Sequence, residues 1–222
     1  MMSDHVFLLS PARCDGRRAA VLMSERAEFE LARRIRGDGA PLGEVFSFLS
    51  GLYFRGKLAY AREFGSAFVI TTDRGLVDPD AMIRRDDLVA FSAVDIAAGN
   101  ERFLDPLRRD LATLAKRVGK SGRVVLLGSI ATPKYVALLT EILGERLLFP
   151  SEFVGRGDMS RGGLLLRCVK EKRELEYVPV LGAVRHGKRP PKLEPLKKEN
   201  ESFNRYERSV PTPIRRHGQS KA

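Results

Sequence analysis

The strongest constraint on the fold is the alternation of short apolar runs with longer segments of helical periodicity. Buried strands are predicted at residues 5–10, 67–71, 123–127 and 147–149. Helices are predicted between them, at residues 24–35, 42–64, 86–91, 100–118 and 132–143. A helix of ten or more residues can return the chain to the edge of the sheet from which it left, so such strands pair in parallel. The sequence therefore predicts an α/β fold of three layers, with a mainly parallel sheet and helices on both faces.

The C-terminal part of the chain divides into a predicted strand pair and a tail. Apolar runs at residues 163–170 and 175–180 predict a C-terminal strand pair. Residues 183–222 contain 11 Lys or Arg, 4 Asp or Glu and five prolines. Such a segment buries too little apolar surface to offset the entropy that it would lose on ordering. We therefore predict a single domain over residues 1–182, followed by a basic, Pro-rich tail that is largely disordered beyond about Pro190.

The charge distribution predicts a nucleic-acid partner. The whole chain carries a formal charge of +11 at pH 7, and the tail alone contributes +7. A basic tail attracts phosphate backbones regardless of sequence and with strong salt dependence, so DNA or RNA is the predicted partner. A tail that serves only solubility is the alternative. The sequence does not specify an oligomeric state.

Several other classes of protein find no support in the sequence. No apolar run approaches the roughly 18 residues of a membrane-spanning helix, and the N-terminus lacks the pattern of a signal peptide. We therefore expect no membrane partner and a cytoplasmic location, where Cys14 and Cys168 would be free thiols. The three histidines are scattered and no nucleotide, haem or flavin fingerprint is present, so we expect no metal site and no cofactor.

Three residues that follow predicted strands are candidates for catalysis, because ligands in such folds bind beyond the carboxyl ends of the strands. Ser10 directly follows the first strand. Asp73 follows the second, where a rigid strand end could hold a general base beside a water molecule. Asp158 lies in the stretch FVGRGDMSRGG at residues 153–163, which predicts a glycine-rich, anion-binding loop after the fourth strand. The alternatives are turn capping by Asp73, an ion pair of Asp158 within its loop, and a flexible solvated loop that binds no anion at residues 153–163.

Two further groups of residues are predicted to contact the substrate. Hydroxyl and guanidinium groups near the same strand ends suit a phosphate or a nucleobase. The predicted substrate-binding residues are Arg13, Cys14, Ser50, Tyr53, Arg55, Ser129, Arg156, Ser160 and Arg161. Among them, Arg156 and Arg161 are predicted phosphate clamps and Tyr53 is predicted to stack on a base, with core packing of Tyr53 as the alternative. The predicted contacts to a nucleic-acid backbone are Lys57, Arg185, Lys188, Arg189 and Lys192.

The stretches SGLYFRGKLAYA…FVITTDRGLVDPDAMIRRDDL and VVLLGS…Y support a resemblance to a known group. Over residues 5–165 the chain resembles small uncharacterised bacterial and phage domains, which are related to modules of the archaeosine synthase group. The segment FLSGLY is similar to an element of the peroxide-stress DNA-binding proteins. The residues that match by position are Ser10, Ser50, Tyr53, Tyr60, Asp73, Gly75, Leu76, Pro79 and Asp80. The cysteine that follows the first serine in these domains is replaced by Pro11, so no thiol role is carried over.

The resemblance implies an α/β domain related to the uracil-DNA glycosylase fold, which works on nucleic acid or a nucleobase. With the charge and the candidate residues, it predicts a hydrolase: a DNA glycosylase-like enzyme of DNA repair or defence. Such an enzyme extrudes a base and breaks an N-glycosidic bond, here with the help of Asp73 or Asp158. Two alternatives remain open. One is a non-catalytic DNA- or RNA-binding protein of stress or phage defence, and the other is a hydrolase or transferase that acts on a phosphorylated small molecule.

Overall fold

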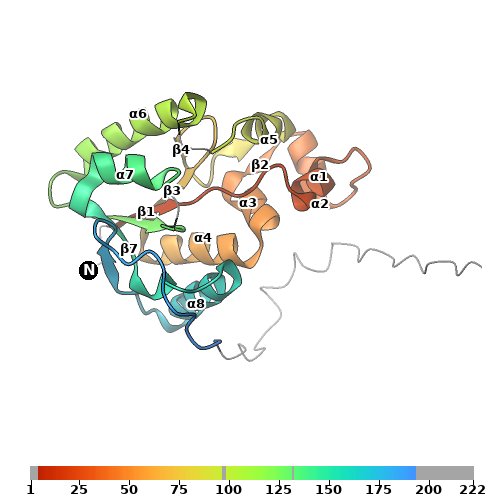
Figure 1. Cartoon of the computed structure of the whole chain (residues 1–222). Coiled ribbons are helices and arrows are strands. Elements are labelled where there is room, and N and C mark those ends of the chain that lie inside the picture. The colour runs from red at the N-terminus through yellow and green to blue at the C-terminus, as the bar shows by residue number, and fades with distance from the viewer. Residues whose placement is uncertain (1–4, 97–98, 132, 194–222) are drawn as a thin grey trace, which may run out of the picture.

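The computed structural model describes residues 5–96, 99–131 and 133–193, and its centre is a six-stranded sheet (Figure 1). The strand order is β4-β3-β1-β6-β7-β8. Four neighbouring strands are parallel, namely β3 (Gly65–Ile70), β1 (His5–Leu9), β6 (Val124–Leu127) and β7 (Leu147–Pro150). The edge strands β4 (Leu76–Val77) and β8 (Tyr177–Pro179) are antiparallel to their neighbours. The predicted α/β fold with a mainly parallel sheet is confirmed.

β1 lies between β3 and β6, and its residues are apolar on both faces. Leu8 and Leu9 are fully buried, as expected for a strand that helices cover on each side. Leu9 pairs with Val69 of β3 and with Leu127 of β6. The residue that follows β1, Ser10, therefore emerges between the carboxyl ends of two other strands.

Helices cover both faces of the sheet, as predicted (Figure 1). α4 (Leu52–Phe64) and α8 (Asp158–Glu171) pack against each other on one face. α6 (Glu101–Val118) and α7 (Val136–Leu143) pack against each other on the other face. Along α6 the buried residues recur every three or four positions, as the sequence predicts: Phe103, Leu107, Leu111 and Leu114.

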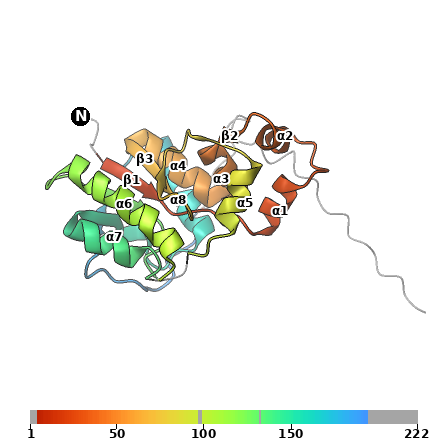
Figure 2. The same cartoon turned by 90° about the horizontal axis from the view of Figure 1, so that it is seen from above.

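The remaining elements gather at one end of the molecule, as Figure 2 shows for the helices. They are α1 (Arg17–Met23), α2 (Glu30–Arg36), α3 (Leu42–Ser50), α5 (Arg85–Ser92) and a two-stranded sheet of β2 (Ala40–Pro41) and β5 (Met82–Ile83). The helix predicted at residues 42–64 is divided at Gly51, which has a φ of 63° and separates α3 from α4. α1 was not predicted. It is only two turns long, and it is stabilised by the burial of Ala19 and Leu22 rather than by a long periodic pattern.

The prediction of a strand at residues 163–170 is wrong, because this segment belongs to α8. Short apolar runs suit either a strand or a helix, and tertiary contacts decide between them. Here Leu164, Leu165 and Cys168 are buried together, at the spacing of one helix face. The predicted C-terminal strand pair therefore does not form, and β8 pairs with β7 instead. Two 3-10 turns, η1 (Gly144–Arg146) and η2 (Ser151–Phe153), flank β7.

Residues 183–193 of the predicted tail have no regular secondary structure, but they lie against the domain. The backbone of Lys188 passes so close to Gly155 that a Cβ there would overlap the Lys188 carbonyl oxygen. Leu193 packs on Gly163 and on the hydrophobic core. The rest of the predicted disordered tail lies outside the described residues. No helix in the described part of the chain is long and apolar enough to cross a membrane.

Candidate functional site

The carboxyl ends of β1 and β6 form the topological switch point of the sheet. The connection from β1 passes through α4 on one face, and the connection from β6 passes through α7 on the other (Figure 1). Ser10 donates its backbone N–H to the carbonyl oxygen of Leu127 at 3.2 Å. A Cβ on Gly128 would lie 2.9 Å from the Cβ of Ser10, so the strand ends approach this closely only because Gly128 has no side chain. Ligands of doubly wound folds bind at such a point.

The side chain of Lys57 reaches this switch point from α4. Its Nζ donates to the carbonyl oxygen of Ser10 at 2.8 Å and to the Ser10 Oγ at 2.9 Å. Lys57 is only 1% exposed. Its Nζ also lies 4.6 Å from the ring centroid of Tyr53 and 4.7 Å from that of Phe54, one turn earlier on the helix. The amine is therefore enclosed by one hydroxyl, one carbonyl and two aromatic rings.

The enclosure of Lys57 changes its protonation. Burial lowers the pKa of Lys57 from its ordinary 10.5 to about 7, while the charge of Asp158 opposes this shift and that of Arg161 adds to it. At neutral pH a large fraction of the amine is thus uncharged, and its lone pair can accept a proton. The Ser10 hydroxyl, within hydrogen-bond distance, is the group that can supply one.

Two buried tyrosines stand beside this pair. Tyr135, which immediately precedes α7, donates its hydroxyl to the carbonyl oxygen of Ser129 at 3.4 Å and lies close to the Ser10 hydroxyl. Burial raises the pKa of Tyr135 to about 12. The buried Tyr53 hydroxyl has no hydrogen-bond partner within the described chain. Arg161 lies close to that hydroxyl, but makes no hydrogen bond of ordinary length and angle with it. The site therefore contains one buried polar group that is left unsatisfied.

The stretch FVGRGDMSRGG does not form the predicted glycine-rich loop, because α8 begins at Asp158. Its arginines are held by the protein itself. Arg161 donates from Nε and Nη2 to the carbonyl oxygen of Phe153 at 3.2 and 3.1 Å, and is only 14% exposed. Arg156 donates to the carbonyl oxygen of Glu152 and to Ser160 Oγ at 3.0 and 3.2 Å. In this structure both guanidinium groups brace the start of α8.

The predicted catalytic carboxylates do not meet at Ser10. Asp158 is 70% exposed, and its Oδ1 lies 3.5 Å from Arg161 Nη1. Asp73 accepts a hydrogen bond from Arg74 Nε at 3.0 Å. In the described structure neither carboxylate forms a hydrogen bond with Ser10 or Lys57. Asp73 instead lines a cavity of about 740 Å³ on the α6 side, together with Val94, Glu101, Arg102, Asp105, Pro106 and Arg109.

The prediction that Lys57 contacts a nucleic-acid backbone is wrong, because the residue is buried and its amine is bonded to Ser10. The spacing of Lys57 from neighbouring tyrosines could have predicted its buried position. Lys57 lies four residues after Tyr53 and three before Tyr60, and both tyrosines suit the buried face of one helix. A lysine on a buried face needs a specific partner, since an isolated buried charge is costly.

The other predicted substrate-binding residues are dispersed. Cys14 is buried, and burial raises the pKa of its thiol to about 12, so it stays protonated at neutral pH. Arg13 is exposed and paired with Asp15. Ser129 lies at the switch point, where its Oγ accepts the Ala131 N–H at 3.3 Å. The other two, Ser50 at the end of α3 and Arg55 on α4, are half-buried.

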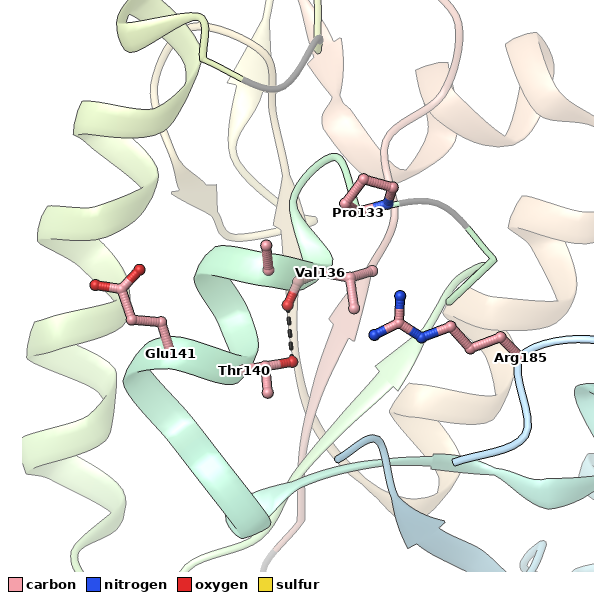
Figure 3. A pocket seen from close by; sticks show the side chains of 6 residues that line it. Pro133, Val136, Thr140, Glu141 and Arg185 are labelled. Atoms are coloured by element: carbon pink, nitrogen blue, oxygen red, sulfur yellow. Dashed lines mark hydrogen bonds between the residues drawn. The ribbon is translucent and has the colours of Figure 1, made fainter. Parts of the chain in front are cut away.

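Residues 183–193 form what we call the cationic strap, which carries Arg185, Lys188, Arg189 and Lys192 and no acidic residue. All four side chains are exposed, and none forms an ion pair within the described chain. Figure 3 shows the Arg185 side chain extending toward Val136 at the start of α7. There Arg185 lines a small cavity of about 260 Å³ with Pro133, Val136, Ala137, Thr140 and Glu141. The strap then passes Gly155, just before α8.

No group of three or more His, Cys, Asp or Glu within the described chain is arranged to hold a metal ion. Comparison with known proteins gives no significant match to a family model, a curated protein or a solved structure. The resemblance drawn from SGLYFRGKLAYA and its neighbouring stretches therefore stays a prediction.

Proposed function

We propose that the protein is an enzyme that acts on nucleic acid and breaks the bond between a base and its sugar at the switch point between β1 and β6. The observation that carries the nucleic-acid part is the cationic strap. Its four exposed cations lie within eight residues that contain no acidic residue, from Arg185 to Lys192. Unpaired cations along an extended segment suit the repeated phosphates of a nucleic-acid strand.

The course of the strap links it to the candidate site. The Arg185 side chain of the strap lies against the start of α7. Tyr135, which directly precedes α7, is close to the Ser10 hydroxyl. Lys188 lies against Gly155, shortly before the helix that carries Arg161. A strand bound along these cations would run past the starts of α7 and α8. This course supports a substrate that is held by its backbone and reacts at the switch point.

The bond class rests on the resemblance and on the chemistry of the site. A base that leaves its sugar must gain a proton, and a group with a pKa near 7 can both accept and donate one at neutral pH. Lys57 is such a group. The base itself would have to be taken out of the stack. Tyr53 does not supply a stacking surface, since it is buried and its ring faces Lys57.

The binding test compares two variants that lose the same charge. Lys188→Gln/Arg189→Gln/Lys192→Gln removes three strap cations. Lys116→Gln/Lys120→Gln/Arg123→Gln removes three exposed cations from the last turn of α6 and the loop before β6. Binding to fluorescent single- and double-stranded DNA and RNA is measured against salt. The slope of log K against log salt is negative, and in the strap variant its magnitude should decrease by about 0.9 per lost phosphate contact for duplex DNA. An equal decrease in affinity and in salt dependence in both variants would contradict binding by the strap.

The catalytic test follows free base and alkali-labile abasic sites in the same oligonucleotides. Wild-type protein is expected to release base from at least one of them, and Ser10→Ala is expected to release none. Salt-dependent binding without any base release would contradict the enzyme and leave a nucleic-acid-binding protein.

A further inference from the structure

We propose that Ser10 is the nucleophile of this site and that Lys57 is the base that takes its proton. This inference rests on the proposed enzymatic function for its substrate, but the pair itself is argued from geometry. Lys57 Nζ lies 2.9 Å from Ser10 Oγ, which is within the range for direct proton transfer. A hydroxyl paired with a lysine amine is one of the known arrangements that activate a serine.

The position of the pair favours reaction over simple bracing. Ser10 is mounted on the end of the central strand and Lys57 on a 13-residue helix, so both are held on rigid elements. Bracing the end of β1 needs only the hydrogen bond to the Ser10 carbonyl oxygen, at 2.8 Å. The second hydrogen bond of the amine goes to the Ser10 hydroxyl, which lies at the switch point. Beside it, Gly128 lets the Tyr135 hydroxyl and Ser10 approach closely, because a Cβ at Gly128 would lie 3.0 Å from the Tyr135 hydroxyl oxygen and 2.9 Å from the Ser10 Cβ.

The groups that face Lys57 set its charge. They are Ser10 after β1, Tyr53 and Phe54 on its own helix, and Asp158 and Arg161 on α8. Burial favours the neutral amine, Arg161 favours it further, and Asp158 favours the ammonium. The hydroxyl of Tyr53 is a donor that has no hydrogen-bond partner within the described chain.

The proposed reaction consumes only water. The lone pair of Lys57 accepts the Ser10 proton as Oγ forms a bond to C1′ of the sugar. The bond from C1′ to the base nitrogen breaks, its electron pair goes to the base, and the Lys57 ammonium protonates that nitrogen. Water then attacks C1′ and gives a proton to Lys57. The bond from Oγ to C1′ breaks, and Oγ regains a proton from the ammonium.

The test uses methanesulfonyl fluoride, a small reagent that sulfonylates activated serine hydroxyls. The full-length protein is treated between pH 6 and pH 9, and modification is located by mass spectrometry of peptides. Wild-type protein should be modified at Ser10, at a rate that rises with pH and is half-maximal near pH 7, where Lys57 loses its proton. Lys57→Met and Lys57→Arg should both lower this rate by about 100-fold, since neither side chain accepts a proton.

Lys57→Arg keeps the positive charge and Lys57→Met removes it. A similar decrease in the rate of Ser10 modification in both variants would therefore result from the loss of the proton acceptor. Unmodified Ser10 in folded wild-type protein would overturn the inference, and so would a rate that does not change with pH. The pH dependence of Ser10 modification in wild-type protein tests the inference even if neither variant folds. The sulfonylation test does not depend on a nucleic-acid substrate. If Ser10 is modified but no base is released from any oligonucleotide, the proposed function is contradicted and the Ser10–Lys57 pair is not. Base release that persists in folded Lys57→Met contradicts the pair alone.

Discussion

Gly56 of α4 and Gly162 of α8 lie in direct backbone contact. A Cβ on Gly56 would be 2.7 Å from the carbonyl oxygen of Gly162, and a Cβ on Gly162 would be 2.6 Å from that of Leu52. Both distances are too short for real atoms, so the two helices cross at a point where only glycine fits. This crossing holds Arg161, the residue before Gly162, close to Tyr53 and to Lys57. Gly162 of the FVGRGDMSRGG stretch thus has a role in helix packing.

Gly162→Ala is expected to destabilise the protein. The added methyl group meets backbone atoms of α4, which cannot move aside as a side chain would. Such overpacking typically lowers the free energy of unfolding by about 1–3 kcal/mol. Urea denaturation followed by circular dichroism measures the change.

The matched control is the next residue, Gly163, which is also inside α8. A Cβ there would meet only the Leu193 side chain, at an ordinary distance of 3.6 Å. Gly163→Ala should therefore raise the free energy of unfolding by up to about 1 kcal/mol, because alanine is the better helix former. Equal effects of the two substitutions would contradict the close crossing of α4 and α8.

The same crossing shows how far the sequence predicts the structure. Buried strands such as β1 and helices with a long periodic stripe such as α6 are predicted well, because local pattern and burial agree there. The glycines of α8 give the opposite local signal, that of a flexible loop. Only the approach of α4, more than 90 residues earlier in the chain, accounts for Gly162 in a helix. Sequence patterns do not contain that contact.

The candidate site was predicted only in part, again because contacts between residues distant in the sequence do not appear in sequence patterns. The rule that ligands bind at strand ends selects Ser10 and Ser129, which do lie at the switch point. The rule that charged residues lie on the surface assigns Lys57 to the wrong place. Its partner is 47 residues away in sequence, and the pair exists only once α4 has docked on β1. Asp73 has a suitable position along the chain, but it accepts its hydrogen bond from Arg74.

Tyr60 and Tyr53, seven residues apart on α4, should respond in opposite ways to the loss of their hydroxyl groups. The Tyr60 hydroxyl accepts the backbone N–H of Leu175 at 2.7 Å and bonds to the Tyr177 hydroxyl at 2.6 Å. Tyr60→Phe leaves that N–H unsatisfied and should lower the free energy of unfolding by about 1–3 kcal/mol. Tyr53→Phe removes a hydroxyl that makes no hydrogen bond, so stability should be unchanged or higher. Urea denaturation tests both, and a loss in Tyr53→Phe as large as that in Tyr60→Phe would show that the Tyr53 hydroxyl has a partner.

The two cysteines are expected to be unreactive in the folded protein. Cys14 and Cys168 are both buried, and burial raises the pKa of each thiol. Reaction with 5,5′-dithiobis(2-nitrobenzoate) at pH 7.5 should therefore release almost no chromophore until the protein is unfolded in guanidinium. Unfolding should then reveal both thiols. Rapid reaction of Cys14 in the native state would place this residue among the candidate nucleophiles.

The buried amine of Lys57 should make the protein more stable as pH rises above neutrality. The pKa of Lys57 is about 7 in the folded protein and about 10.5 in an exposed lysine. Between these two values the unfolded chain binds more protons than the folded one, so the free energy of unfolding increases with pH. The greatest slope from one such group is about 1.4 kcal/mol per pH unit.

The Lys57 contribution is isolated by comparison with Lys57→Met, because buried tyrosines and thiols with raised pKa values oppose it at high pH. Such groups stabilise the folded state below their unfolded pKa values and lose that effect above them. They are common to both proteins and cancel in the difference. Urea denaturation at pH 7, 8 and 9 should show the stability of wild-type protein relative to Lys57→Met rising with pH. Parallel pH dependences would mean that Lys57 stays charged in the folded protein, and the amine could not then act as a base at neutral pH.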